Sequence, residues 1–325
     1  MEGIGIKISF IFIDIILPLV VGYICKKKDW LSSRQCNVLI RFNIIVVMTI
    51  LTLLSFWILP LRAELAMLPV FSFLNVLLPW GLVKLSGRHK KFSSLTDQGS
   101  YLIVSMPANI GSLAGLCGFI LYGELSFAYV QIVGVFQNLV MLFVLFPMAY
   151  YYKYSSEHGG AVNLGAMNWR ALFLNWNQLS VAGIIVGMIL YSFDVPRPQI
   201  LGDFFQFLIH FSAWAALVPI GYMIEFTHLQ TYCRQTLDII PVKMIITPLV
   251  LYLVGTLFFS DAVLLGTLII MMAAPCAINS LITARLYGLN VNLAMAPFIT
   301  TTVVYVFVLY PLFYILVAMG ILPFR

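Results

Sequence analysis

Apolar residues in this chain of 325 residues come in runs of about 20, which short polar and often basic segments separate. A helix of about 20 residues crosses the roughly 30 Å hydrocarbon core of a bilayer, because an α-helix rises about 1.5 Å per residue. A membrane β-barrel would instead show alternation over about 10 residues. The pattern predicts ten transmembrane helices, over residues 7–25, 36–59, 64–85, 96–122, 125–152, 177–194, 200–225, 236–259, 261–286 and 291–318.

The composition supports a membrane protein and excludes a soluble one. Hydrophobic residues make up 62% of the chain and charged residues 9%, whereas a soluble domain is about half apolar and about a quarter charged. Five cysteines are too few for a disulfide-stabilised scaffold. We therefore expect an all-α polytopic membrane protein that sits in a lipid bilayer.

The basic residues indicate the orientation of the chain in the membrane. The net charge of +6 comes from 18 Lys and Arg against 12 Asp and Glu. Fourteen of those 18 lie in or beside the odd-numbered loops, between apolar runs, so no nucleic-acid partner is expected. Because loops rich in Lys and Arg stay in the cytoplasm, we expect the odd-numbered loops there and both termini on the opposite side. We also expect the protein to lie in the plasma membrane.

Two short strings recur at one offset. Val21-Gly22 recurs as Val186-Gly187, and Leu121–Gly123 recurs as Leu286–Gly288, each 165 residues later. The shared offset indicates a duplication with five spans in each half, and an odd number of spans inverts the second half. Inverted repeats are typical of transporters, whose substrate sites lie near the midplane.

The duplication predicts the organisation of the chain. We expect a first five-helix repeat over residues 1–152 and a second over residues 177–325. Residues 153–176 would form a cytoplasmic loop and an interfacial helix, the latter over Asn168–Trp176, with tryptophans at headgroup level.

The fourth and ninth spans are interrupted at corresponding places. Proline removes a backbone donor and clashes with the preceding turn, so it kinks or breaks a helix. A second half-helix that starts near the midplane would offer free N–H groups and its positive dipole end to an anion. The alternative is that each proline only kinks a packed helix. The candidate substrate ligands, together with Gln137 of the fifth span, are Pro107, Asn109, Gly111, Pro275, Cys276 and Asn279.

Other polar residues also lie within apolar runs. Asp14 is a candidate proton or cation site, and Asn43 and Asn75 are weaker candidates for coupling. His210 is expected to be a hydrogen-bonded interior residue rather than a switch. Lys243 lies near a cytoplasmic helix end, where we expect its side chain to extend to the aqueous interface.

Several of these stretches resemble the auxin efflux carrier family, which includes plant auxin exporters and bacterial organic-acid permeases. Their order and spacing match over nearly the whole chain. The stretches that carry the resemblance are Leu17–Tyr23, Arg41-Phe42, Pro107–Asn109, Leu121–Glu124, Val130–Val133, Gln137, Ala274–Ser280 and Ala284–Gly288.

The resemblance implies ten helices in two inverted repeats, with broken helices 4 and 9 that cross at the substrate. It implies a scaffold of helices 1, 2, 6 and 7 and a transport bundle of helices 3–5 and 8–10, and it is consistent with a homodimer formed through the scaffold. The family's crossover Asn matches Asn109, its helix-5 Gln matches Gln137, and the bacterial Asn after the second Pro matches Asn279.

Two positions depart from the family pattern. Thr49 stands where helix 2 of the family usually has Pro, and Asn75 stands where plant members have an acidic residue. Because an Asn side chain does not exchange a proton near neutral pH, the second departure argues against proton coupling through that position.

We predict a secondary transporter of small organic anions, such as mono- or dicarboxylates, that works by alternating access. Two alternatives stay open: a sodium-coupled organic anion symporter of related fold, and a membrane sensor that binds its substrate without moving it. An enzyme is not expected, because the sequence shows no Ser/His pair, paired aspartates or metal-ligand set, and no cofactor is expected. The sequence leaves open the substrate, the direction of transport, the coupling ion and the oligomeric state.

Overall fold

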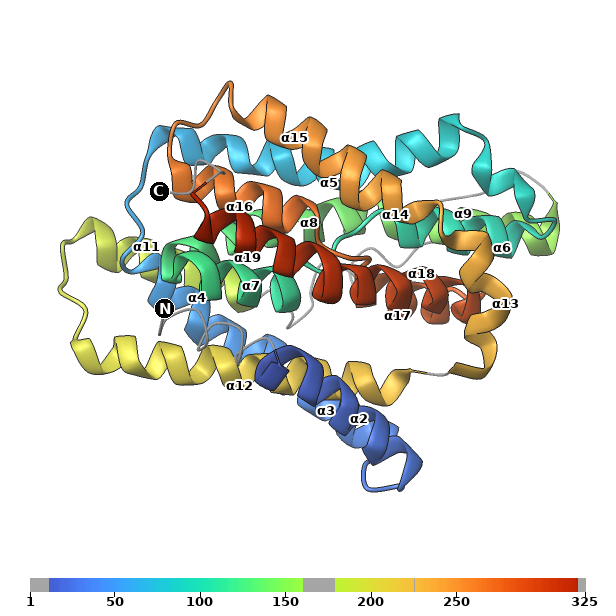
Figure 1. Cartoon of the computed structure of the whole chain (residues 1–325), viewed down its shortest axis with the longest axis horizontal. Helices are drawn as coiled ribbons and strands as arrows, with labels where there is room; N and C mark the ends of the chain where they lie inside the picture. The colour runs from blue at the N-terminus through green and yellow to red at the C-terminus, as the bar shows by residue number, and fades with distance from the viewer. Residues whose placement is uncertain (1–11, 160–178, 225, 321–325) are drawn as a thin grey trace. The chain divides into compact units, whose positions relative to one another are not determined.

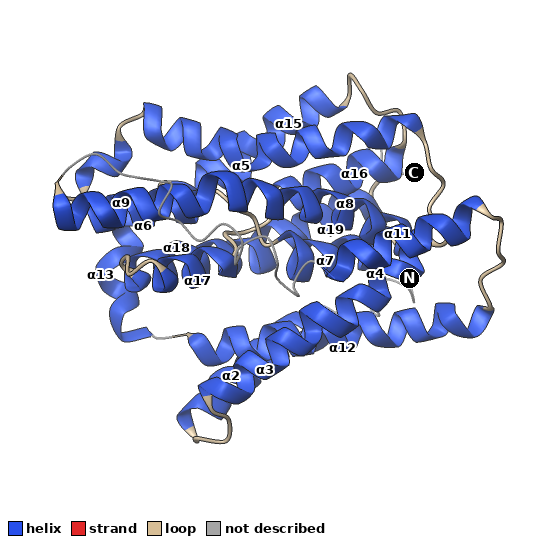
Figure 2. Ribbon diagram, turned by 180° about the vertical axis from the view of Figure 1, so that it is seen from behind, coloured by secondary structure: helices blue, strands red, loops and turns tan. Residues whose placement is uncertain are grey.

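The chain folds into helices. The structure, a computed structural model, describes residues 12–159, 179–224 and 226–320. Within these ranges the elements are helices joined by loops, with no strand (Figure 2). The all-helical fold expected from the apolar runs is therefore confirmed, while the interfacial helix predicted at Asn168–Trp176 lies outside the described residues.

The helices agree with the predicted spans in place and character. Five helical stretches are long and apolar enough to cross a membrane: Ser33–Phe56, Ala63–Leu85, Glu124–His158, Gln199–Met223 and Val291–Ala318. Four shorter apolar stretches are Ile110–Tyr122, Leu179–Ser192, Ile239–Gly255 and Ala262–Met272. The number of ten transmembrane helices stays a prediction.

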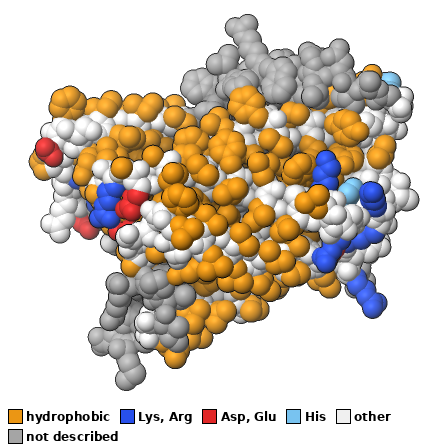
Figure 3. Space-filling view, turned by 90° about the horizontal axis from the view of Figure 1, so that it is seen from above, with side chains coloured by type: hydrophobic (Ala, Val, Ile, Leu, Met, Phe, Trp, Pro, Cys, Tyr) orange, Lys and Arg blue, Asp and Glu red, His pale blue; other side chains and the backbone are white. Residues whose placement is uncertain are grey.

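Large apolar side chains remain exposed along these helices, as a surface facing lipid requires. Examples are Leu253 and Phe207, which are 65% and 64% exposed. Figure 3 shows one face on which hydrophobic side chains cover most of the area. A soluble protein would rarely leave so large an apolar area in water.

The chain divides into two compact units. Unit 1 comprises residues 1–66, 111–131 and 174–224, and unit 2 comprises residues 67–110, 132–173 and 225–325. The described helices of unit 1 are η1 (Phe12–Ile16), α2 (Leu17–Lys27), α3 (Ser33–Phe42), η2 (Asn43–Val47), α4 (Met48–Phe56), α7 (Gly115–Tyr122), α11 (Leu179–Ser192) and α12 (Gln199–Met223).

Unit 1 is built on two close helix pairs, α2 with α12 and α4 with α11 (Figure 1). Glycine allows each approach. A Cβ atom at Gly22 of α2 would collide with the backbone of Val218 in α12, and one at Gly187 of α11 would collide with the carbonyl of Leu53 in α4. Small residues that bring backbones together are typical of helix packing in membranes.

Unit 2 contains the whole of the ninth predicted span and the first part of the fourth, up to Ile110. Its helices are η3 (Ala63–Met67, shared with unit 1), α5 (Leu68–Leu85), η4 (Arg88–Lys91), α6 (Leu95–Ser105), η6 (Met141–Leu145), α9 (Phe146–His158), α13 (Phe226–Thr236), α14 (Ile239–Pro241), η9 (Val242–Ile246), α15 (Thr247–Gly255), α16 (Ala262–Met272), α17 (Ile278–Leu286), α18 (Val291–Val304), η10 (Tyr305–Leu309) and α19 (Tyr310–Ala318). Helices α8 (Glu124–Val140) and η5 (Ile110–Ala114) pass from one unit to the other.

Both interrupted spans are broken. Helix α6 ends at Ser105 and the chain becomes helical again at Ile110, while α16 ends at Met272 and α17 begins at Ile278. Pro107 and Pro275 lie inside these gaps. Proline lacks an N–H group and disfavours the helical conformation in the residue before it, which explains why both helices stop there. We call residues 106–109 the first break and residues 273–277 the second break.

Candidate functional site

The two breaks are hydrogen-bonded to each other. The N–H of Asn109 donates to the carbonyl of Pro275 at 2.7 Å, and the N–H of Ala277 donates to the carbonyl of Pro107 at 3.1 Å. The exchange is symmetric, because in each break the residue two positions after proline donates to the other proline. All four residues are buried. The extended backbones of the two breaks therefore lie side by side inside unit 2. Each break supplies hydrogen-bond partners to backbone groups of the other.

Gln137 holds the first break from helix α8. Its side-chain oxygen accepts a hydrogen bond from the N–H of Ala108 at 3.0 Å, and its side-chain nitrogen donates to the carbonyl of Ala108 at 2.8 Å. The side chain is buried, with 4% of the residue exposed. Both ends of the amide are therefore committed to the backbone, so Gln137 positions the break.

Lys243 is the residue that the sequence analysis placed wrongly. It is 0% exposed, and its ammonium donates to the carbonyls of Ser105 at 3.1 Å and Met106 at 2.9 Å. The expected extension to the aqueous interface is contradicted. The cause is the end of helix α6: its last carbonyls lack intrahelical donors, and the negative end of the helix dipole attracts a cation.

The carbonyl groups of residues 105–108 all have donors, from Lys243, Ala277 and Gln137. The second break is held in a similar way, since the N–H of Cys276 donates to the hydroxyl of Thr301 at 3.1 Å. The N–H groups of Asn109, Cys276 and Ala277, which precede the second half-helices, are therefore hydrogen-bonded within the protein and not free. At the start of α17, the N–H groups of Ile278 and Asn279 have no acceptor within the described part of the chain.

Lys243 has no acidic partner within the ranges that the structure describes. It is also the one Lys, Arg, Asp or Glu residue of unit 2 that is buried there. Two carbonyl dipoles stabilise an ammonium but do not neutralise it. A buried charge without a counter-charge is expensive at membrane depth, so this interior favours an added negative charge.

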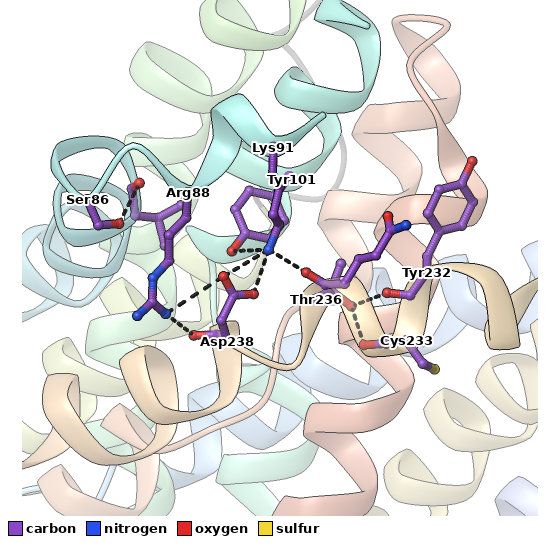
Figure 4. A network of polar contacts seen from close by, with 10 residues as sticks. Ser86, Arg88, Lys91, Tyr101, Tyr232, Cys233, Thr236 and Asp238 are labelled. Carbon is purple, nitrogen blue, oxygen red and sulfur yellow. Dashed lines mark hydrogen bonds and ion pairs between the residues drawn. The ribbon is translucent and has the colours of Figure 1, made fainter. Parts of the chain in front are cut away.

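A polar network fixes the segment that carries Lys243 (Figure 4). Lys91 of η4 contacts both carboxylate oxygens of Asp238 at 2.9 Å and also donates to the carbonyl of Gln235 and, at 3.4 Å, to the hydroxyl of Tyr101. Asp238 immediately precedes α14 and lies five residues before Lys243. The network joins α6, η4 and the start of the eighth predicted span, which sets the register of Lys243 against the end of α6.

The remaining candidates fall into two groups. In unit 2, Asn279 is half-buried and its amide lies 3.7 Å from the sulfur of Met141, while Asn75 of α5 is fully buried and neither end of its amide has a partner among the described residues. Gly111 belongs to unit 1 and is separate from the contacts above.

Two of the coupling candidates also lie in unit 1. Asn43 is buried, and its side-chain oxygen lacks a partner within the described ranges. Asp14 is buried and contacts His210, which confirms the expectation that this histidine is hydrogen-bonded. No group of three or more metal-ligating side chains is found in the described part of the chain.

Comparison with known proteins gives one family. A family model described as membrane transport protein matches residues 8–314, nearly the whole chain. A search of the curated proteins gives no match.

Proposed function

The chain belongs to the membrane transport protein family, the family of the auxin efflux carriers, and from this premise we propose that it is a secondary transporter of small organic anions such as mono- or dicarboxylates. The resemblance inferred from the sequence motifs is thereby confirmed, and it makes the chain a membrane transporter. The substrate class, the site and the mechanism are the proposal.

One observation carries the choice of an anion: the buried Lys243 beside the paired breaks. Its charge has no acidic partner among the described residues, and it holds the end of α6 from which the first break leads on. A cationic substrate would be repelled here. A carboxylate would provide the counter-charge that the interior of unit 2 lacks.

We place the carboxylate at the junction of the two breaks. The amides of Asn109 and Asn279 and the N–H groups at the start of α17 are the proposed donors, and the positive end of the α17 dipole adds to their effect. Pro107, Pro275 and Cys276 shape the breaks, while Gln137 and Lys243 position the first one.

Ten helices in two inverted repeats are the proposed architecture. Two symmetric features support it. The breaks exchange equivalent hydrogen bonds through Asn109 and Ala277. Gly22 and Gly187, which belong to the recurring Val-Gly string, each lie at a close contact: span 1 against span 7, and span 6 against span 2. An inversion that maps span 1 on span 6 also maps span 2 on span 7.

The proposed mechanism is alternating access by rigid-body movement of one bundle against the other. The proposed scaffold helices 1, 2, 6 and 7 fall in unit 1, which also includes residues 111–131 of helices 4 and 5, and the breaks lie in unit 2. Two compact units supply the two bodies that such a mechanism needs. The inverted arrangement would let the same site open to either side of the membrane.

The test is counterflow of labelled mono- and dicarboxylates into liposomes that contain the purified full chain. Counterflow detects electroneutral exchange as well as current-carrying transport. We expect saturable uptake of at least one acid, which is lost in Asn109→Ala and kept in Asn37→Ala, a matched change at an exposed asparagine. Uptake that survives in Asn109→Ala would overturn the site.

The same experiment separates the alternatives. Uptake that requires a sodium gradient would identify a sodium-coupled symporter. Thermal stabilisation of the protein by an acid that it does not move would identify a sensor. Neither uptake nor stabilisation by any acid of the panel would contradict the proposed substrate class.

A further inference from the structure

Unit 1 holds a carboxylate and an imidazole in contact inside the predicted membrane region. Oδ2 of Asp14 lies 2.6 Å from Nδ1 of His210. Asp14 belongs to the π-helical segment η1 of the first predicted span, and His210 belongs to α12. The Asp14 side chain is 3% exposed and the His210 side chain is 29% exposed, so the carboxylate is buried and the imidazole is partly exposed.

Among the described residues, the pair is far from other charges along its own helices. Asp14 precedes the cytoplasmic Lys26 by 12 residues, or about 18 Å of helix, and His210 follows Asp203 by seven residues, or about 10 Å. Helices α4 and η2, which also pack on α12, carry no charged residue. The titratable groups on the elements packed against the pair are Tyr23, Cys25, Lys26 and Lys27 in α2, Arg34, Cys36 and Arg41 in α3, Cys117 and Tyr122 in α7, and Asp203 and Tyr222 in α12.

Asp14 is the one acidic residue that is buried in the described ranges. No Lys or Arg lies within ion-pair distance of it there, so within those ranges its counter-charge comes from a protonated His210. With one proton the pair is neutral overall. If that proton is removed, the pair is left with the negative charge of the carboxylate at membrane depth. If a second proton is added, the pair is left with the positive charge of the imidazolium. Each protonation step therefore changes the net charge of the site by one.

We propose that Asp14 and His210 form a proton-binding site in unit 1, which exchanges a proton with water through the partly exposed imidazole. Imidazole is the side chain whose ordinary charge change falls between pH 5 and 8. The ligand is the proton itself. The inference goes beyond the proposed function and does not rest on the anion site, which lies in unit 2.

Infrared difference spectroscopy on the full chain in liposomes tests the site without any substrate. Spectra between pH 5 and pH 9 report both the imidazole ring modes and the carboxyl stretch. We expect one step in which the bands of an imidazole and a carboxyl change together. The step is lost in Asp14→Asn and in His210→Gln, and it is kept in Asp203→Asn, a matched change at an exposed carboxylate on the same helix.

A second measurement covers the case in which a variant does not fold. The chain has four histidines, so replacing His89, His158 and His228 with glutamine leaves His210 as the single source of imidazole signals in nitrogen NMR. A ring that changes its protonation between pH 5 and 9 supports the site. A ring with one unchanging state, or an infrared step that persists in both pair variants, would overturn it.

Discussion

The charge of Lys243 has an effect on anion binding that can be worked out from the structure. Lys243→Met keeps the volume and removes the charge. Nζ lies 2.9 Å from the carbonyl oxygen of Met106, and Asn109 is three residues further along, so the residues of the first break lie within about 14 Å of Nζ. At an effective dielectric constant of about 20, two unit charges about 10 Å apart interact by about 1.7 kcal/mol. A monocarboxylate should then bind roughly 20-fold more weakly.

The assay compares a monocarboxylate with its neutral amide on purified protein, by titration calorimetry. The carboxylate should lose affinity in Lys243→Met while any binding of the amide stays the same. Lys84→Met removes an exposed charge at the end of α5 and should leave both affinities within twofold. A folded Lys243→Met protein that binds the carboxylate with wild-type affinity would refute the role of this lysine.

Three further predictions concern stability and can be measured by thermal unfolding in detergent. Gln137→Ala leaves the N–H of Ala108 buried and unpaired and leaves its carbonyl with Ile110 as the one donor, so it should lower stability by about 1–3 kcal/mol, and Gln137→Leu, which restores volume but no hydrogen bond, should not rescue it. Thr301→Val removes the acceptor for the N–H of Cys276 at nearly constant volume and should cost about 1–3 kcal/mol; an unchanged melting temperature would show that the bond is dispensable. Gly22→Ala should destabilise unit 1, whereas Gly81→Ala, with nothing within 4 Å of the new Cβ, should not, and equal effects would contradict the close contact of α2 with α12.

The positions of the helices and of both breaks could be read from the sequence, because apolar length and proline act locally. Helices α6 and α16 end close to Pro107 and Pro275, as the missing donor requires. The resemblance to a family also indicated the candidate site residues Asn109, Gln137 and Asn279, which all belong to unit 2. The end of a helix at a proline is determined by the residues within a few positions of that proline.

Lys243 and Gln137 show what the sequence could not supply. The partner of Lys243 is the end of another span, more than 130 residues away, and a periodicity argument does not show which helix end a lysine faces. The sequence did contain one indication that Lys243 is buried. It lies seven residues inside its predicted span, or about 10 Å along the helix axis. For Gln137, the type of residue indicated an amide donor and acceptor, but only the fold shows that Ala108 takes both.

The central claim is that the paired breaks of unit 2 hold a small organic anion. The most direct measurement is a high-resolution structure of the full chain in a lipid nanodisc with the carboxylate that it transports. We predict density for the carboxylate at the junction of residues 106–109 and 273–277, within hydrogen-bond distance of the Asn109 side chain. A carboxylate bound elsewhere, with the junction closed by the Asn109–Pro275 and Ala277–Pro107 hydrogen bonds and no ligand at it, would contradict the account.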